Sequence, residues 1–409
     1  MPNSPSRSKG SYWSQLLPEL LNLISTRLTD IADVARFRAI CSQWRLAAPH
    51  LLAQPLPWLI PPFLSLSLPD RFFSLSSNSI LNLTLLPDSP GAQCVGSSRG
   101  WLFILGLTPS FSLLNPFLPA QIRLPSLTTL PFILKFCDSD EVEEEYVLMA
   151  EDGNIYTETA SEVRDSTIQK AFLSSDLSDA ACLAFILLSG PHTLAFSLLV
   201  SDSWTMVKDF GYPPSRISDI TFHDGRCFIL DSIGRLRVSD IGHSDPPKFS
   251  LISTIKIPWG FTTHLVESSH NLLLVLQRLI RRSESYSDGL APPFHVHSID
   301  LSGNPRLLDV EEFSGEVLFL GHNHSFSLSV KDAVHGRFQG NQVFFTAACC
   351  VNGSRGDLIL RYDHKDHSVH CVLFNDFDGE ERSVMTSMLE FYEFKWATPK
   401  WVFPSLCSR

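Results

Sequence analysis

One short segment has the residue types of a serine hydrolase site. Residues 96–100 (GSSRG) match the pattern Gly-x-Ser-x-Gly, in which a strand leads into the nucleophilic serine and a helix follows it. Here residues 101–105 (WLFIL) follow, and they have the composition of a strand. Because the helix that would position the serine is replaced by a strand pattern, the sequence predicts a plain β-turn in preference to a hydrolase elbow.

Histidines are grouped in two places at spacings that a metal site could use. His364, His367 and His370 are three residues apart, and His295 and His297 share one face of a predicted strand. A zinc site needs about four ligands, usually with paired cysteines, and the sequence has no Cys-x-x-Cys. We therefore expect surface or hydrogen-bonded histidines, no bound metal and no other cofactor.

The most acidic segment is residues 138–146 (DSDEVEEEY), which contain six acidic side chains. Like charges repel one another and stay hydrated, so the segment is expected to form a solvated loop. The alternative is a surface that contacts a basic patch on a partner protein.

Composition limits the classes of partner and compartment. The 409 residues are 44% apolar and 18% charged, enough for one large core or two to three ordinary ones, and 32 basic against 43 acidic residues give a net charge of −11. This charge argues against a nucleic-acid partner. Nine irregularly placed cysteines, with no apolar secretory signal in the first residues, predict the cytosol or the nucleus.

Two long uncharged stretches do not predict a membrane partner. Residues 51–68 contain four prolines, each of which removes an amide donor that a helix in lipid needs. Residues 180–201 are divided by Ser-Gly-Pro-His at 189–192, which predicts a buried β-hairpin made of LAFILL and LAFSLLV.

Helical periodicity is confined to the N-terminal part of the chain. Residues 1–10 are small and polar and are expected to be disordered. In residues 11–49, apolar side chains recur every three to four positions, Ser14 and Asp30 are expected helix caps, and a third helix is expected to carry Phe37, Ile40, Cys41 and Trp44. Such a small unit cannot bury a self-sufficient core, so an exposed apolar face is expected. The proline-rich residues 50–70 are expected to be a stiff linker.

From about residue 71 the periodicity shortens to two, which predicts an all-β region. The clearest unit begins at Ile217 with the strands ISDITF, RCFILD, RLRVSD and FSLIST, and Asp224-Gly225 is a strong hairpin-turn pair between the first two. Four consecutive antiparallel strands make a propeller blade. About 330 residues at 40–50 per blade predict six to eight blades, and seven is the preferred count.

The N-terminal segment WSQLLPELLNLISTRLTDIADVARFRAICSQWRLAA resembles the F-box, the helical module that binds Skp-type adaptors in cullin-based ubiquitin ligases. Residues 18–21 (PELL) and the ending Cys41-x-x-Trp44-Arg45 stand in F-box order. One departure is Leu17, where many relatives have proline, and the sequence leaves open whether this change weakens adaptor binding. The resemblance implies adaptor contacts by Leu16, Pro18, Leu20, Leu21, Ile24, Leu28, Val34 and Trp44.

The remainder, from about residue 71 to 405, is similar to the plant F-box proteins that have a C-terminal KIB-like β-propeller. The similar motifs are CVGSSRGWLFIL, LLNPFLPAQIRLP, SDITFHDGRCFILDSIGRLRVSD, THLVESSHNLLLV, GEVLFLGHNHSFSLSV and KWVFPS, in this order. The expected fold class is therefore mainly β, with a short three-helix F-box followed by a β-propeller. The resemblance implies recruitment of a protein substrate and carries no catalytic residues.

Three functions remain open at this point. In the first, the chain is a non-catalytic subunit of a ligase, with a Skp-type adaptor, a cullin reached through it, and an unknown protein substrate as partners. In the second, the propeller binds a small molecule or is a hydrolase, and the helices form a cap. In the third, an F-box chain binds partners without assembling a ligase.

Overall fold

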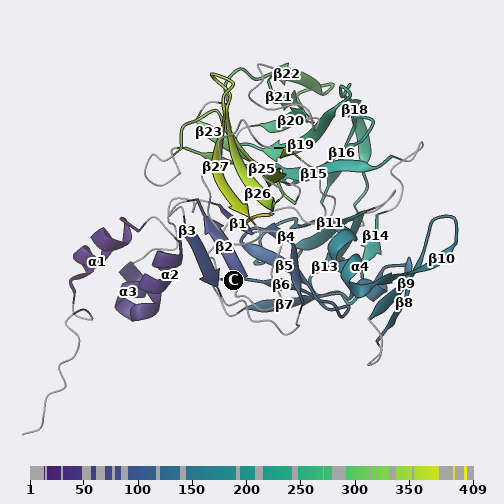
Figure 1. The fold of residues 1–409 in the computed structure, drawn as a ribbon, viewed down its shortest axis with the longest axis horizontal. Coiled ribbons are helices and arrows are strands. Elements are labelled where there is room, and N and C mark those ends of the chain that lie inside the picture. Colours follow the sequence, from purple (N-terminus) through teal and green to yellow (C-terminus); the bar gives the residue numbers. More distant parts are fainter. Residues whose placement is uncertain are drawn as a thin grey trace, which may run out of the picture.

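The computed structural model shows a ring of antiparallel sheets with three short helices beside it (Figure 1). The described residues are 13, 16–28, 31–47, 57–60, 70–75, 79–83, 91–116, 120–138, 144–189, 194–207, 215–241, 247–269, 271–278, 292–313, 315–321, 323–330, 338–351, 354–376, 390–391 and 400–402.

The helical part consists of α1 (Pro18–Ser25), α2 (Ile31–Ile40) and α3 (Ser42–Ala47). The expected caps Ser14 and Asp30, and residues 1–10, lie outside the described residues. The third helix was predicted with the wrong limits, because Phe37 and Ile40 belong to α2 and the chain leaves the helix at Cys41. This break turns Trp44 of α3 back onto Phe37, and their ring centroids are 4.4 Å apart. Among the described residues, no helix is long and apolar enough to span a membrane.

Among the described residues, six blades follow one another around the ring, and the first four are separate four-stranded sheets. The first four blades comprise β29 (Lys400–Val402), β1 (Trp58–Ile60), β2 (Asp70–Ser74) and β3 (Ser79–Leu83); β4 (Gln93–Ser98), β5 (Trp101–Leu105), β6 (Phe111–Leu114) and β7 (Gln121–Leu124); β11 (Ile168–Leu173), β12 (Leu183–Leu188), β13 (Leu194–Leu198) and β14 (Thr205–Met206); and β15 (Ile217–His223), β16 (Arg226–Asp231), β17 (Arg235–Asp240) and β18 (Ser250–Thr254).

The fifth and sixth blades are joined into one sheet. The fifth contains β19 (Phe261–Glu267), β20 (Leu272–Arg278), β21 (Phe294–Asp300) and β22 (Arg306–Asp309); the sixth contains β23 (Glu316–Leu320), β24 (Phe326–Ser329), β25 (Gln342–Val351), β26 (Ser354–Asp363), β27 (Val369–Asp376) and β28 (Glu390–Phe391). A parallel bridge between Glu267 and Phe326 connects them, and β23 and β25 are also parallel.

Hydrogen bonds and an ion pair cross the boundaries between neighbouring blades. Each contact joins two blades, so together they establish which blades are neighbours in space. In ring order they are Ser97 Oγ to Trp401 O (2.5 Å), Leu173 N to Ser98 Oγ (3.1 Å), Lys170 Nζ to Asp219 Oδ1 (2.5 Å), Leu265 N to Asp219 Oδ2 (2.7 Å), Ser327 Oγ to Glu267 O (3.0 Å) and Trp401 Nε1 to Leu320 O (2.9 Å).

The ring closes through strands from opposite parts of the chain. β29, near the C-terminus, pairs antiparallel with β1, near the N-terminus, with Trp58 opposite Val402. Residues 57–60 fall inside the segment expected to be a linker, yet their side chains are buried. The prediction of a linker over residues 50–70 is therefore wrong for residues 58–60. These residues form strand β1 of the first blade, which pairs with β29.

A further sheet lies off the ring. It consists of β8 (Ile133–Cys137), β9 (Glu145–Met149) and β10 (Ile155–Thr159), and it projects on the side away from the N-terminal helices (Figure 1). The bond from Leu173 N to Ser98 Oγ shows that the second and third blades are direct neighbours. The described residues therefore form six blades, which is within the predicted range of six to eight and below the preferred seven.

The blade that begins at Ile217 has the four predicted strands. Asp224 and Gly225 both have positive φ, 49° and 71°, as the predicted hairpin turn requires. Strands β12 and β13 form the predicted buried hairpin. Phe172 of β11 stacks on Phe185 of β12 at 5.4 Å and meets Phe222 of β15 edge-on at 5.6 Å, so aromatic packing fills the space between the third and fourth blades.

Candidate functional site

The helical module has a small core of its own. Leu21, Val34, Phe37 and Trp44 are buried against one another. Ser25 Oγ bonds to the carbonyl oxygens of Asn22 and Ala47, both at 2.8 Å, and so ties α1 to α3. Each helix alone is too short to be stable in water, so this shared core is what keeps them helical.

Helix α1 begins where its sequence allows it to begin. Pro18 occupies the first turn, where an absent amide hydrogen is harmless, and Glu19 places a negative charge at the positive end of the helix. Leu21 and Ser25 face inward. The proline therefore fixes the helix start one residue after Leu17.

The outer face of α1 is apolar and exposed. Leu17, Leu20 and Ile24 are 63%, 45% and 37% exposed, and Leu23 beside them is about half exposed. Positions 17, 20 and 24 follow helical spacing, so these three side chains line one stripe. A soluble helix usually shows polar residues on such a face, and an apolar stripe of this kind marks a binding surface.

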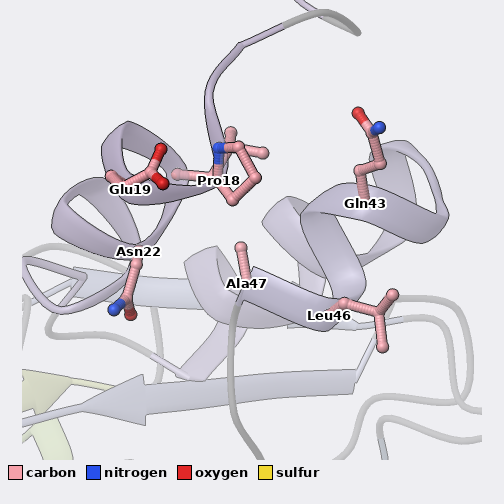
Figure 2. A pocket seen from close by; sticks show the side chains of 7 residues that line it. Pro18, Glu19, Asn22, Gln43, Leu46 and Ala47 are labelled. Atoms are coloured by element: carbon pink, nitrogen blue, oxygen red, sulfur yellow. The ribbon is translucent and has the colours of Figure 1, made fainter.

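A groove of about 520 Å³ lies between α1 and α3 (Figure 2). In Figure 2, Pro18 and Glu19 stand at the start of one wall, and Leu46 lies on the facing helix. Its lining is mostly apolar with a few polar groups: Pro18, Glu19, Leu21, Asn22, Gln43, Leu46 and Ala47. The groove and the stripe on α1 adjoin at Pro18, which gives one continuous surface for a partner.

The eight residues that the resemblance implied as adaptor contacts divide into three groups. Pro18, Leu20 and Ile24 are exposed; Leu16 and Leu28 are half-buried; and Leu21, Val34 and Trp44 are buried in the module core. Leu23 and Leu46 are also exposed and are not among these eight residues. Leu23 carried a usable signal, because it follows Leu20 by three residues.

The Gly-x-Ser-x-Gly segment is a hairpin turn, as predicted. Arg99 and Gly100 have φ of 50° and 80° and join β4 directly to β5. Ser98 is buried, and its Oγ accepts a hydrogen bond from Leu173 N. The serine thus holds two blades together and has no following helix.

Most of the selected histidines are hydrogen-bonded, as expected. His297 Nδ1 lies 2.8 Å from Asp309 Oδ1, His364 Nε2 lies 3.3 Å from Val310 O, and His367 Nδ1 lies 2.7 Å from Tyr362 Oη. The side chain of His370 lies outside the described residues. Within the described part of the chain, no three His, Cys, Asp or Glu side chains are grouped so that they could hold a metal ion.

Polar side chains on the inner strands pair with one another. Besides the Lys170–Asp219 ion pair, His264 Nε2 contacts Gln277 Oε1 at 3.0 Å and its Nδ1 contacts Ser325 Oγ at 3.3 Å. Removal from water lowers the pKa of His264 and lowers that of His324 to about 4. The bonds of Lys170, Asp219 and His264 thus hold neighbouring segments of the propeller together.

A ring of mainly antiparallel blades with a separate N-terminal helical module defines the class of β-propeller proteins that carry an N-terminal helical module. Residues 72–375 match the KIB1-4 β-propeller family, and the chain belongs to this family of plant F-box proteins.

Two relatives from Arabidopsis thaliana cover almost the whole chain. The F-box protein SKIP23 is 26% identical, and the alignment covers 95% of each chain. The F-box protein At2g17036 is 25% identical, and the alignment covers 96% of this chain and 95% of the relative. Because both alignments cover more of the chain than residues 72–375, the similarity to these relatives is not confined to the propeller.

Proposed function

We propose that this protein is the substrate-recognition subunit of a cullin-based, SCF-type ubiquitin ligase in the cytosol or nucleus. In this proposal α1 to α3 bind a Skp-type adaptor, which connects them to a cullin, and the propeller recruits a protein substrate. The observation that carries the proposal is the exposed apolar stripe of Leu17, Leu20 and Ile24 on a module that has a separate core.

The energetic argument rests on the area that the stripe leaves in water. Complete burial of a leucine or isoleucine side chain contributes about 1.5–3 kcal/mol. Since these side chains are already more than a third exposed in the folded chain, a partner can bury them without unfolding the module. The groove between α1 and α3 can accept side chains from the same partner.

The proposed role needs no catalytic group on this chain. A subunit that holds a substrate beside another enzyme raises the effective concentration of the two reactants, and this alone accelerates the transfer. Two observations support a non-catalytic role in substrate recruitment. The chain belongs to a family of F-box proteins, and its helical module has a core separate from the propeller.

The proposal is tested by replacing Leu20 and Ile24 with aspartate together. We expect the affinity for a purified Skp-type adaptor to fall by about 100-fold or more, because two apolar contacts are lost and two charges would have to be desolvated. Surface plasmon resonance with the full chain measures this affinity.

Val200→Asp is the matched control. Val200 is an exposed apolar residue on a propeller turn, so this variant has the same chemical change outside the helices and must bind the adaptor normally. Equal affinity of all three proteins would refute the adaptor site. A pulldown of the full chain with the adaptor and a cullin tests the rest of the proposal. If the adaptor binds but the cullin is not recovered, the ligase role is refuted, and the protein is an F-box chain that acts outside a ligase.

A further inference from the structure

The sheet off the ring ends in an open edge strand. Among the described residues, β10 pairs with β9 and with no other strand. Ile155 is 65% exposed, Tyr156 and Thr157 are also exposed, and Met149 opposite Ile155 adds a further exposed apolar side chain. An apolar edge of this kind is a template for another strand.

The direction of the backbone groups on β10 follows from the two backbone hydrogen bonds that flank its pairing with β9. Ala150 N donates to Asn154 O at 2.8 Å, and Ala160 N donates to Glu144 O at 2.7 Å. Hydrogen-bonded and non-hydrogen-bonded pairs alternate in an antiparallel ladder. The amide and carbonyl groups of Ile155 and Thr157 therefore point away from β9, toward the open edge.

Proteins usually protect such an edge, and of the usual devices the strand IYTET has a single charged side chain, Glu158. Lysine, proline and β-bulges are the common devices that prevent strand addition. The strand IYTET contains neither lysine nor proline, and its pairing with β9 runs without a register shift from Ile155 to Thr159. Its regular edge is suited to pairing.

The chain segment that contains β10 is acidic. Residues 144–163 contain six acidic side chains and no lysine or arginine. Burial raises the pKa of Glu158, and repulsion from Glu162 raises it further. An added positive charge would relieve this repulsion, so the edge favours a basic partner over a neutral or acidic one.

We propose that β10 is the edge on which substrates dock: a basic, extended segment of the substrate adds to the sheet as its fourth strand. This inference rests on the proposed function and names the recruiting surface. Ile155 and Met149 share one face of the sheet and Tyr156 and Glu158 the other. A segment in which apolar and basic residues alternate matches both faces, and backbone bonds supply the pairing itself.

The test uses a fluorescent nine-residue peptide in which lysine alternates with valine, and the full chain. Fluorescence anisotropy is expected to show binding that Thr157→Pro weakens by about tenfold or more, because proline removes the outward amide donor of Thr157. Thr157→Ala keeps that amide and is expected to bind as the native chain does. Glu158→Gln is expected to reduce the salt dependence of binding.

Because Thr157→Pro could lose binding simply by misfolding, a second peptide is tested on the native chain. The same peptide with N-methylated valines keeps its charge and apolar groups but cannot pair as a strand, and it must not bind the native chain. Equal binding of the two peptides, no binding of either, or equal affinities of the proline and alanine variants would each overturn the inference. The variant Leu20→Asp with Ile24→Asp should bind the peptide normally, so this test and the adaptor test fail independently.

Discussion

At the scale of single residues, buried charge on the inner strands joins neighbouring blades. Lys170 of the third blade and Asp219 of the fourth are almost fully buried, and Asp219 also accepts bonds from the backbone of Ile220 and Leu265. Each charge is stabilised by the other, because isolated charges are strongly disfavoured away from water.

Replacing Lys170 with methionine is expected to lower the free energy of unfolding by about 3 kcal/mol, because Asp219 remains buried without its counter-ion. Urea denaturation measures this loss. Arg306→Met is the control, since Arg306, whose side chain is 72% exposed, forms an ion pair with Asp300, and its loss should be below about 1 kcal/mol. Similar losses in both variants would contradict the assigned role of the buried pair.

At the scale of elements, turn geometry explains why the blades could be recognised from the sequence. Gly225 and Gly234 both have positive φ, 71° and 85°. They differ in their surroundings. A Cβ atom at Gly225 would meet nothing within 4 Å, whereas one at Gly234 would lie 1.8 Å from Ile255 O.

Gly225→Ala is therefore expected to destabilise the protein by about 1 kcal/mol through backbone strain alone. Gly234→Ala adds a collision with the backbone of the neighbouring segment, and we expect a loss of about 3 kcal/mol or more. Thermal and urea unfolding of the two variants separate these contributions. Equal losses would show that the contact between Gly234 and Ile255 is unimportant.

The elements of the helical module show what periodicity could predict about the site. The 3–4 residue spacing identified α1 and its apolar positions correctly. Since α1 has apolar residues on both its inner and its outer face, spacing did not separate Leu21, which is buried, from Leu20 and Ile24, which are exposed. The packing of α2 and α3 on one side of α1 decided this.

At the scale of the whole molecule, the ring depends on β29, which comes from the end of the chain and fills the inner position of the first blade. Its Trp401 is 1% exposed and bonds through Nε1 to Leu320 O in the sixth blade. The backbone carbonyl oxygen of Trp401 accepts a hydrogen bond from Ser97 Oγ in the second blade. One strand thus contacts both neighbours of the blade that it completes.

Trp401→Ala is expected to lower the free energy of unfolding by about 3–5 kcal/mol, because it removes a large buried side chain at the ring closure. Trp259→Ala is the matched control, since Trp259 is fully exposed, and it should have almost no effect. Urea unfolding followed by far-ultraviolet circular dichroism measures both. A small effect of Trp401→Ala would mean that β29 is not needed to close the ring.

The sequence by itself determined the β class, the four-strand blade from Ile217, the turn at residues 96–100 and the hairpin of β12 and β13, because period-two patterns and turn residues act locally. It also determined the helical module and, through the order of its motifs, the family. These features depend on contacts between residues that are near one another in the chain.

Only the tertiary structure decided the number of blades, the place of Trp58–Ile60 and the position of β8 to β10. Each depends on which strands meet across the ring, and β1 and β29 are separated by most of the chain. Strand pairing over such distances leaves no local pattern, since any strand of suitable length and composition could fill the position. The physical reason is that ring closure is selected by packing in three dimensions.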